Sequence, residues 1–155
     1  MPECEGRASS ANLPTILFVD DEPGLRALAL EMLCDNGFKA FTAGDGLEAL
    51  EQLGANPDID VLISDIRMPR MGGEELLAIA QARNPALKVA LLTGFADDAF
   101  TLLDQQQWPI FLKPFDIERL PALALQVAQG PEAVKRGRSA GMTSPVGKVR
   151  PLPRR

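Results

Sequence analysis

The sequence contains no histidine and no tyrosine, and its only indole is that of Trp108. Without histidine, these 155 residues cannot supply a Ser-His-Asp or a Cys-His catalytic pair. They also cannot carry a phosphohistidine. Any histidine chemistry in which the chain takes part must therefore come from a partner molecule.

Cysteines and long apolar runs are also scarce. One cysteine, Cys4, lies in an N-terminal stretch without a hydrophobic pattern, and the other, Cys34, lies in a predicted helix. We therefore expect two reduced thiols, as in a reducing cytoplasm. No apolar stretch approaches the roughly 20 residues of a membrane helix, and the first residues lack the apolar segment of a signal peptide. These absences predict a cytoplasmic protein that does not enter a membrane.

Charge and composition divide the chain into three parts. Residues 130–155 hold seven basic residues and one acid, a net charge of +6, so the rest carries −11 against a total of −5. This segment is rich in Pro, Gly and Ser and has no apolar period, which is typical of disorder. We predict a disordered leader at residues 1–13, one folded domain at residues 14–129 and a basic disordered tail at residues 130–155.

Within residues 14–129, five short apolar runs alternate with helical patterns. The predicted strands are residues 16–19, 39–42, 61–64, 87–92 and 110–112. The predicted helices begin near Pro23, after Asp45, at Glu74, at Ala96 and at Asp116. With right-handed crossovers, this order gives a parallel sheet with helices on both faces.

Local signals support these boundaries. Gly37 suits the left-handed residue that ends a helix, and Asp45 with Glu48 forms a capping-box pattern. Pro121 lies inside the last helical pattern, so we expect that helix to begin late or to bend.

Polar residues follow the ends of four predicted strands. Asp20 and Asp21 follow the first strand, and Asp65 follows the third. Thr93 and Lys113 follow the fourth and fifth strands. In an open α/β sheet, the site lies outside the carboxyl ends of the strands. Three carboxylates, a hydroxyl and an ammonium are therefore expected to meet at one edge, a set that suits a divalent metal and a phosphoryl group.

Each of these residues also has an ordinary structural explanation. Acidic residues at a helix N-terminus are favoured by the helix dipole alone. Asp65 could cap a loop, Thr93 could simply favour a strand, and Lys113 could extend along the surface. Their common register favours the chemical interpretation. In that interpretation, Asp65 is a nucleophile that forms an aspartyl phosphate, a reaction that depends on positioning and charge neutralisation.

Residues 14–129 resemble the receiver domain of two-component response regulators, the CheY-like family. The resemblance rests on Asp20, Asp21, Asp65, Thr93 and Lys113, on the stretch DIRMPRMGGEELL that begins at Asp65, and on KPF at Lys113. It implies an α/β, flavodoxin-like, doubly wound sheet of five parallel strands in the order 2-1-3-4-5, with five helices.

The resemblance also implies a function. Mg²⁺ would be bound by Asp20, Asp21, Asp65 and the backbone carbonyl of Arg67. Asp65 would take a phosphoryl group from a sensor histidine kinase or a histidine phosphotransfer protein, and Thr93 and Lys113 would then bind the attached phosphoryl group. The face made by helix 4, strand 5 and helix 5 would then contact a downstream protein or a second receiver. Such a protein is a phosphoacceptor that catalyses only its own phosphorylation and dephosphorylation.

The sequence departs from the family pattern before strand 5. The family usually has Tyr or Phe three residues before the lysine, whereas this chain has Ile110. Phe111 is adjacent, but it should point to the opposite face of the strand. The coupling between the site and the surface is therefore expected to differ, with Phe95 or Trp108 as candidates.

Three other functional classes are less well supported. An aspartate-nucleophile phosphatase would need a general acid two residues beyond Asp65, where Arg67 stays charged. The basic tail could bind nucleic acid weakly, but no recognition pattern accompanies it, so we expect no nucleic-acid partner. A flavodoxin would need a phosphate-binding loop after the first strand, where Asp20 and Asp21 would repel phosphate.

Overall fold

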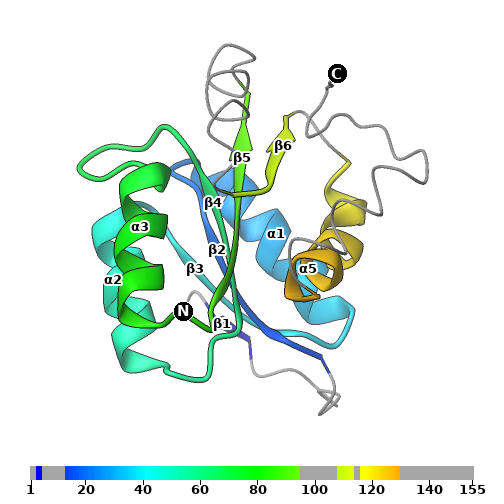
Figure 1. Cartoon of the computed structure of the whole chain (residues 1–155). Helices are drawn as coiled ribbons and strands as arrows, with labels where there is room; N and C mark the ends of the chain where they lie inside the picture. The colour runs from blue at the N-terminus through cyan, green and yellow to red at the C-terminus, as the bar shows by residue number, and fades with distance from the viewer. Residues whose placement is uncertain (1–2, 5–12, 95–107, 114–115, 130–155) are drawn as a thin grey trace.

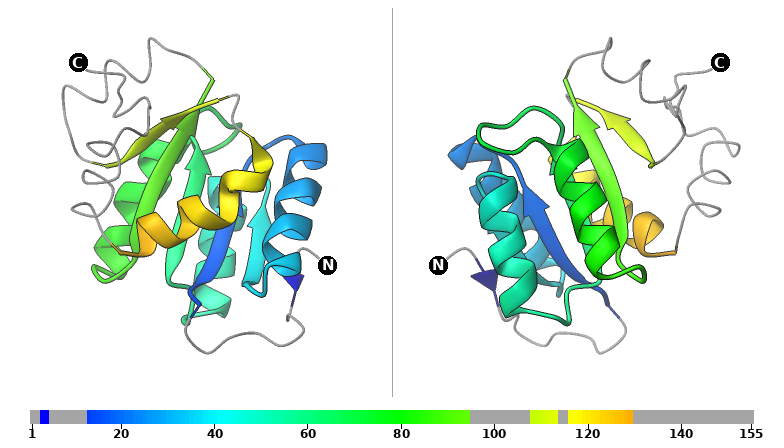
Figure 2. Two further views of the ribbon diagram at one scale, coloured as in Figure 1. Left: turned by 90° about the vertical axis from the view of Figure 1, so that its right-hand side faces the viewer. Right: turned by 60° about the vertical axis from the view of Figure 1, so that its left-hand side comes forward.

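The computed structural model describes residues 3–4, 13–94, 108–113 and 116–129. Its centre is one sheet, with α2 (Gly46–Ala55) and α3 (Gly73–Arg83) on one face. The other face carries α1 (Pro23–Asp35) and α5 (Leu120–Ala128), as Figure 1 and the two turned views of Figure 2 show. The result is a three-layer α/β arrangement.

Five parallel strands form most of the sheet. They are β2 (Thr15–Val19), β3 (Lys39–Ala43), β4 (Val61–Asp65), β5 (Lys88–Thr93) and β6 (Ile110–Leu112). Their order across the sheet is β3-β2-β4-β5-β6, which confirms the predicted order 2-1-3-4-5. The predicted strand positions are also confirmed to within one or two residues.

A sixth strand lies where the sequence suggested a disordered leader. Strand β1 (Glu3–Cys4) pairs antiparallel with β3 at the edge of the sheet. The prediction of disorder is therefore wrong for these two residues, while residues 5–12 lie outside the described part. Cys34 in α1 is in a disulfide. The expectation of a reduced thiol is thus wrong for Cys34.

Alternating residues of the strands face two separate cores. Leu17 and Leu62 belong to the core beneath α2 and α3, whereas Phe18 and Ile63 belong to the core beneath α1 and α5. This alternation follows from the two-residue period of a strand. Because both faces are covered, the strands are mainly apolar, and their polar residues lie at the strand ends or, as with the buried Thr42 and Ser64, one residue before them.

The ends of the helices follow most of the predicted signals. The Asp45 carboxylate accepts a hydrogen bond from the Glu48 N–H at 2.9 Å. The Glu48 carboxylate, however, accepts from the N–H of Gly44 at 2.5 Å, one residue before the cap of the ideal box. The last helix begins late, as Pro121 predicted: a 3₁₀ turn, Ile117–Arg119, precedes α5. The predicted helix at residues 96–105 lies outside the described residues.

Among the helices of the described residues, none has the length and apolar character that crossing a bilayer requires. This agrees with the absence of a long apolar run in the sequence.

Gly37 ends α1 with a φ of +89°, in the left-handed region that favours glycine. We expect Gly37→Ala to lower the free energy of unfolding by roughly 1–2 kcal/mol, because the new Cβ strains the backbone there. Urea unfolding at equilibrium measures this change. The control is Gly54→Ala: Gly54 is in α2 with open space around it, so the same substitution should stabilise by roughly 0.5–1 kcal/mol. Equal effects of the two substitutions would contradict the assignment.

Candidate functional site

The carboxyl ends of four parallel strands meet at one edge of the sheet. Asp20 follows β2 and precedes Asp21, Asp65 ends β4, Thr93 ends β5, and Lys113 follows β6. Each side chain is placed by the strand before it, and the register of the strands sets their separation. The structure thus brings together at this edge the residues singled out in the sequence.

Lys113 links two of the carboxylates directly. Its Nζ donates to Asp20 Oδ2 at 2.6 Å and to Asp65 Oδ2 at 3.1 Å. The Asp20 side chain is almost fully buried, and the other two side chains are 14–21% exposed. The second oxygen of Asp20 accepts the N–H of Glu22 at 2.9 Å. Asp20 is therefore held from two sides, by a cation and by the backbone of its own loop.

The acidic residues form a cluster that could hold a metal ion. One carboxylate oxygen from each of Asp20, Asp21 and Asp65 lies within 4.8 Å of the others. Hard carboxylate oxygens at this spacing fit a small divalent cation. Asp21 is exposed, so the cluster opens to solvent on its side. A bound cation would also reduce the repulsion among the three carboxylates.

The surroundings change the acid–base properties of two of these groups. Burial raises the pKa of Asp65 above its ordinary value, although the charge and hydrogen bond of Lys113 oppose the change. Burial by itself would lower the pKa of Lys113, but its hydrogen bonds and charge interactions with Asp20 and Asp65 outweigh this, so that pKa is raised. Lys113 thus stays charged at neutral pH, while the raised pKa of Asp65 means that its ionised form is disfavoured even with this ammonium 3.1 Å away.

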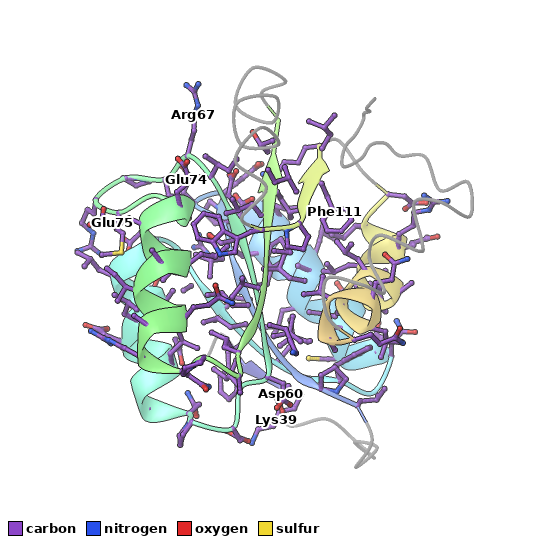
Figure 3. The ribbon with its side chains drawn as sticks, in the orientation of Figure 1. Lys39, Asp60, Arg67, Glu74, Glu75 and Phe111 are labelled. Carbon is purple, nitrogen blue, oxygen red and sulfur yellow. The ribbon has the colours of Figure 1, made fainter. Side chains whose placement is uncertain are left out.

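Arg67 lies two residues beyond Asp65, in the loop between β4 and α3. Its side chain is exposed and extends away from the body of the protein at the edge where the site lies (Figure 3). Figure 3 also shows Lys39 and Asp60 at the opposite edge of the sheet, far from the acidic cluster. The charges that define the site are therefore gathered at one end of the molecule.

The structure also shows where the residues that depart from the family pattern, around the start of β6, are placed. Ile110 is buried in the core beneath α2 and α3, whereas Phe111 packs against the core of the other face. The prediction that these two side chains point in opposite directions is confirmed. Trp108 donates its indole N–H to Oε1 of Gln81 in α3 at 3.0 Å, which ties the segment before β6 to that helix. Phe95 lies outside the described residues.

Sequence reasoning missed residues that shape the loop between β4 and α3. Gly73 packs so tightly that a Cβ there would collide with the carbonyl oxygen of Asp65. Arg70 has a φ of +67° and is paired with Asp45. The two consecutive glycines, Gly72 and Gly73, could have indicated that the backbone approaches the Asp65 carbonyl closely. No local sequence pattern predicts the conformation of Arg70.

A comparison with known families decides the classification. The sequence model described as the response regulator receiver domain matches residues 16–125. The chain belongs to the response regulator receiver family. As the resemblance implied, this receiver is part of two-component signalling, and its five parallel strands have the order that the resemblance implied.

Individual relatives agree with this assignment. The receiver is 33% identical over 111 residues to the sensor kinase CckA of Brucella abortus, covering 68% of the receiver and 12% of the kinase. It is 38% identical over 107 residues to the DNA-binding transcriptional regulator NtrC of Escherichia coli, covering 68% and 23%. The crystal structure of a receiver domain protein from Clostridium thermocellum has a TM-score of 0.64 at 26% identity, covering 83% and 99%. The chain thus spans a quarter or less of these two longer relatives.

The raised pKa of Asp65 leads to a prediction about stability. A raised pKa means that folding disfavours the ionised carboxylate, so the metal-free receiver loses stability as the pH rises through that pKa. In EDTA at pH 7, we expect Asp65→Asn to raise the urea concentration at which half of the protein is unfolded. The slope of the unfolding free energy against urea concentration should not change. The difference from wild type should shrink as the pH falls through the raised pKa.

The matched control is Asp58→Asn. Asp58 is 59% exposed and lies 3.6 Å from Lys39, a surface pair of the kind that contributes about 0–1 kcal/mol. A midpoint that falls in Asp65→Asn, or that rises equally in both variants, would contradict the argument.

Proposed function

We propose that this receiver accepts a phosphoryl group on Asp65 from a phosphohistidine of another protein. The observation that carries the proposal is the ammonium of Lys113, which contacts Asp65 and Asp20 beside a third carboxylate. This arrangement offers a nucleophilic carboxylate, a fixed positive charge and cation ligands within one small region. It suits phosphoryl transfer, which depends on positioning and charge neutralisation.

In the proposed step, an oxygen of the Asp65 carboxylate attacks the phosphorus atom of the donor. A P–O bond forms, the P–N bond to the imidazole breaks, and the imidazole leaves with that electron pair and takes up a proton. The product is an acyl phosphate on Asp65. These 155 residues contain no histidine, so the proposed donor lies outside them, on a sensor histidine kinase or a histidine phosphotransfer protein.

The proposed cofactor is Mg²⁺, held by Asp20, Asp21, Asp65 and the backbone carbonyl of Arg67. When bound, it neutralises charge on the transferring phosphoryl oxygens. The support is the carboxylate donor set and its spacing. Asp20 is the best positioned ligand, since Lys113 and the Glu22 N–H already orient its two oxygens.

Lys113 and Thr93 are proposed to bind the phosphoryl group once it is attached. Lys113 can leave the Asp65 carboxylate for a phosphoryl oxygen without a large movement, because Asp20 continues to hold it. Thr93 is buried at the end of β5, and its carbonyl accepts the backbone N–H of Lys113 at 2.7 Å. A shift of Thr93 would therefore be transmitted to the start of the segment after β6.

The proposed output surface comprises β6, α5 and the predicted helix at residues 96–105, which lies outside the described residues. It would contact a downstream protein or a second receiver. We propose residues 14–129 as the signalling domain and residues 130–155 as a basic disordered tail, with no nucleic-acid partner and no membrane contact.

The protein is proposed to catalyse only its own phosphorylation and dephosphorylation. The alternative, an aspartate-nucleophile phosphatase, is not favoured by the family assignment. It also lacks support at Arg67, where the exposed guanidinium is a poor general acid.

Intact-protein mass spectrometry tests the central proposal. After incubation with acetyl phosphate and Mg²⁺, we expect wild type to gain one phosphate. Asp65→Asn should gain none, and Asp58→Asn should behave as wild type, because Asp58 lies at the far edge of the sheet. Omitting Mg²⁺ or adding EDTA should suppress the gain. Equal phosphate incorporation in Asp65→Asn would place the acceptor elsewhere.

The proposed location is the cytoplasm, where stable disulfides are rare. Cys34 is in a disulfide in the structure, so a cytoplasmic location predicts that this bond is reduced inside the cell. In cells lysed directly into acid and then alkylated without a reductant, Cys34 should therefore be modified. Alkylation that requires a reductant would point to an oxidising compartment or to an unusually stable bond.

A further inference from the structure

The loop between β4 and α3 is joined to the start of α2 by an ion pair outside the acidic cluster. Arg70, in this loop, donates to Oδ2 of Asp45 through Nε at 2.8 Å and through Nη2 at 2.5 Å. Asp45 is the N-cap of α2, and its side chain is only 11% exposed. Hydrogen bonds from the Glu48 N–H and from Arg70 hold the pKa of Asp45 below its ordinary value, so the carboxylate is charged at neutral pH.

The backbone conformation of Arg70 shows that this contact is not incidental. Its φ of +67° makes it the only residue other than glycine in the left-handed region within the described part of the chain. A residue with a Cβ is disfavoured there, so the surrounding structure must stabilise it. The two hydrogen bonds to Asp45 provide that stabilisation from an element 25 residues earlier in the sequence.

A second set of contacts joins the same loop to α2. The N–H of Gly46 donates to the carbonyl of Met71 at 3.2 Å. The Met71 side chain packs so closely on Gly46 that a Cβ there would lie 2.6 Å from it. Arg70 and Met71 therefore fasten consecutive loop residues to consecutive residues of the α2 terminus.

This loop directly follows Asp65 in the chain. It begins at Ile66, runs on the side of the sheet that carries α2 and α3 (Figure 1), and closes where the N–H of Gly73 donates to the carbonyl of Ile66 at 2.8 Å. Arg67, whose carbonyl is a proposed cation ligand, lies within it. The position of that carbonyl therefore depends on how the loop is held.

We propose that Arg70 is a positioning residue: its ion pair with Asp45 holds the β4–α3 loop against α2, and so sets the affinity of the acidic cluster for Mg²⁺. The inference rests on the proposed function only in that the cluster binds this cation. Arg70 itself touches neither Asp20 nor Asp65 among its described contacts.

The sign of the effect separates positioning from simple electrostatics. Removing a positive charge near an acidic site should strengthen cation binding by long-range attraction. Loss of a holding contact should weaken it. We expect Arg70→Gly, which suits the left-handed backbone, to weaken Mg²⁺ binding about three- to tenfold, less than the typical loss when a residue bonded directly to a ligand is removed.

Three further variants complete the test. Asp45→Asn keeps an N-cap acceptor but loses the ionic contact, and should resemble Arg70→Gly. The double variant should lose little more than either single variant, because both remove one interaction. Arg83→Gln removes an exposed arginine at the end of α3 and should bind Mg²⁺ as wild type or slightly more tightly.

Two readouts are independent of phosphate transfer. Calorimetric titration with MgCl₂ measures the affinity, and amide hydrogen exchange at Gly46 reports on its bond to Met71. We expect faster exchange at Gly46 in Arg70→Gly and unchanged exchange in Arg83→Gln.

Unchanged or tighter Mg²⁺ binding in Arg70→Gly, or no Mg²⁺ binding by wild type, would overturn the inference. Arg70→Gly could weaken Mg²⁺ binding and speed exchange at Gly46 while wild type takes no phosphate from acetyl phosphate. In that case the inference stands and the proposed function fails.

Discussion

The ammonium of Lys113 holds together two carboxylates that would otherwise repel each other. Asp20 directly follows β2 and Asp65 ends β4, and the pairing of these two strands brings both side chains into one region. Without a cation, two negative charges at such a separation destabilise the fold. Lys113, which directly follows β6, offsets part of this cost, so its contacts contribute to stability. Phosphorylation would change the charge that Lys113 must balance, and this is how a local reaction can alter the forces on a neighbouring strand.

The three-layer fold places the polar residues of the site at the carboxyl ends of the strands. Strands covered on both faces have mainly apolar side chains before their ends, and parallel strands all end on the same side. The site is thus a consequence of the topology as well as of the residues placed there. Ile110 and Phe111 show the same rule at work on β6, since adjacent residues enter different cores. With a buried aliphatic side chain at Ile110, an aromatic rotation at that position is not available, and the Trp108–Gln81 contact provides a different link toward α3.

Much of this could be predicted from the sequence because the signals are local. Apolar runs bounded by polar residues and followed by helical periods predict the strands, the helices and the positions of the five site residues, whereas the order of the strands was implied by the family resemblance. The missed features depend on contacts between distant residues. The left-handed backbone conformation of Arg70 is accompanied by its ion pair with Asp45. No sequence pattern between these two residues predicts that pair. The pairing of β1 was missed for the same reason: the N-terminal residues have no periodic pattern, and only their pairing with β3 gives them a structure.

The short strand β1 has a consequence for association between molecules. A sheet that ended at β3 would present a row of unpaired N–H and C=O groups, to which a strand of another chain could add. Glu3 and Cys4 pair with Phe41 and Ala40 and so occupy part of that row. These two residues therefore shorten the part of the β3 edge that is open to pairing with another chain, on the border of the sheet farthest from β6.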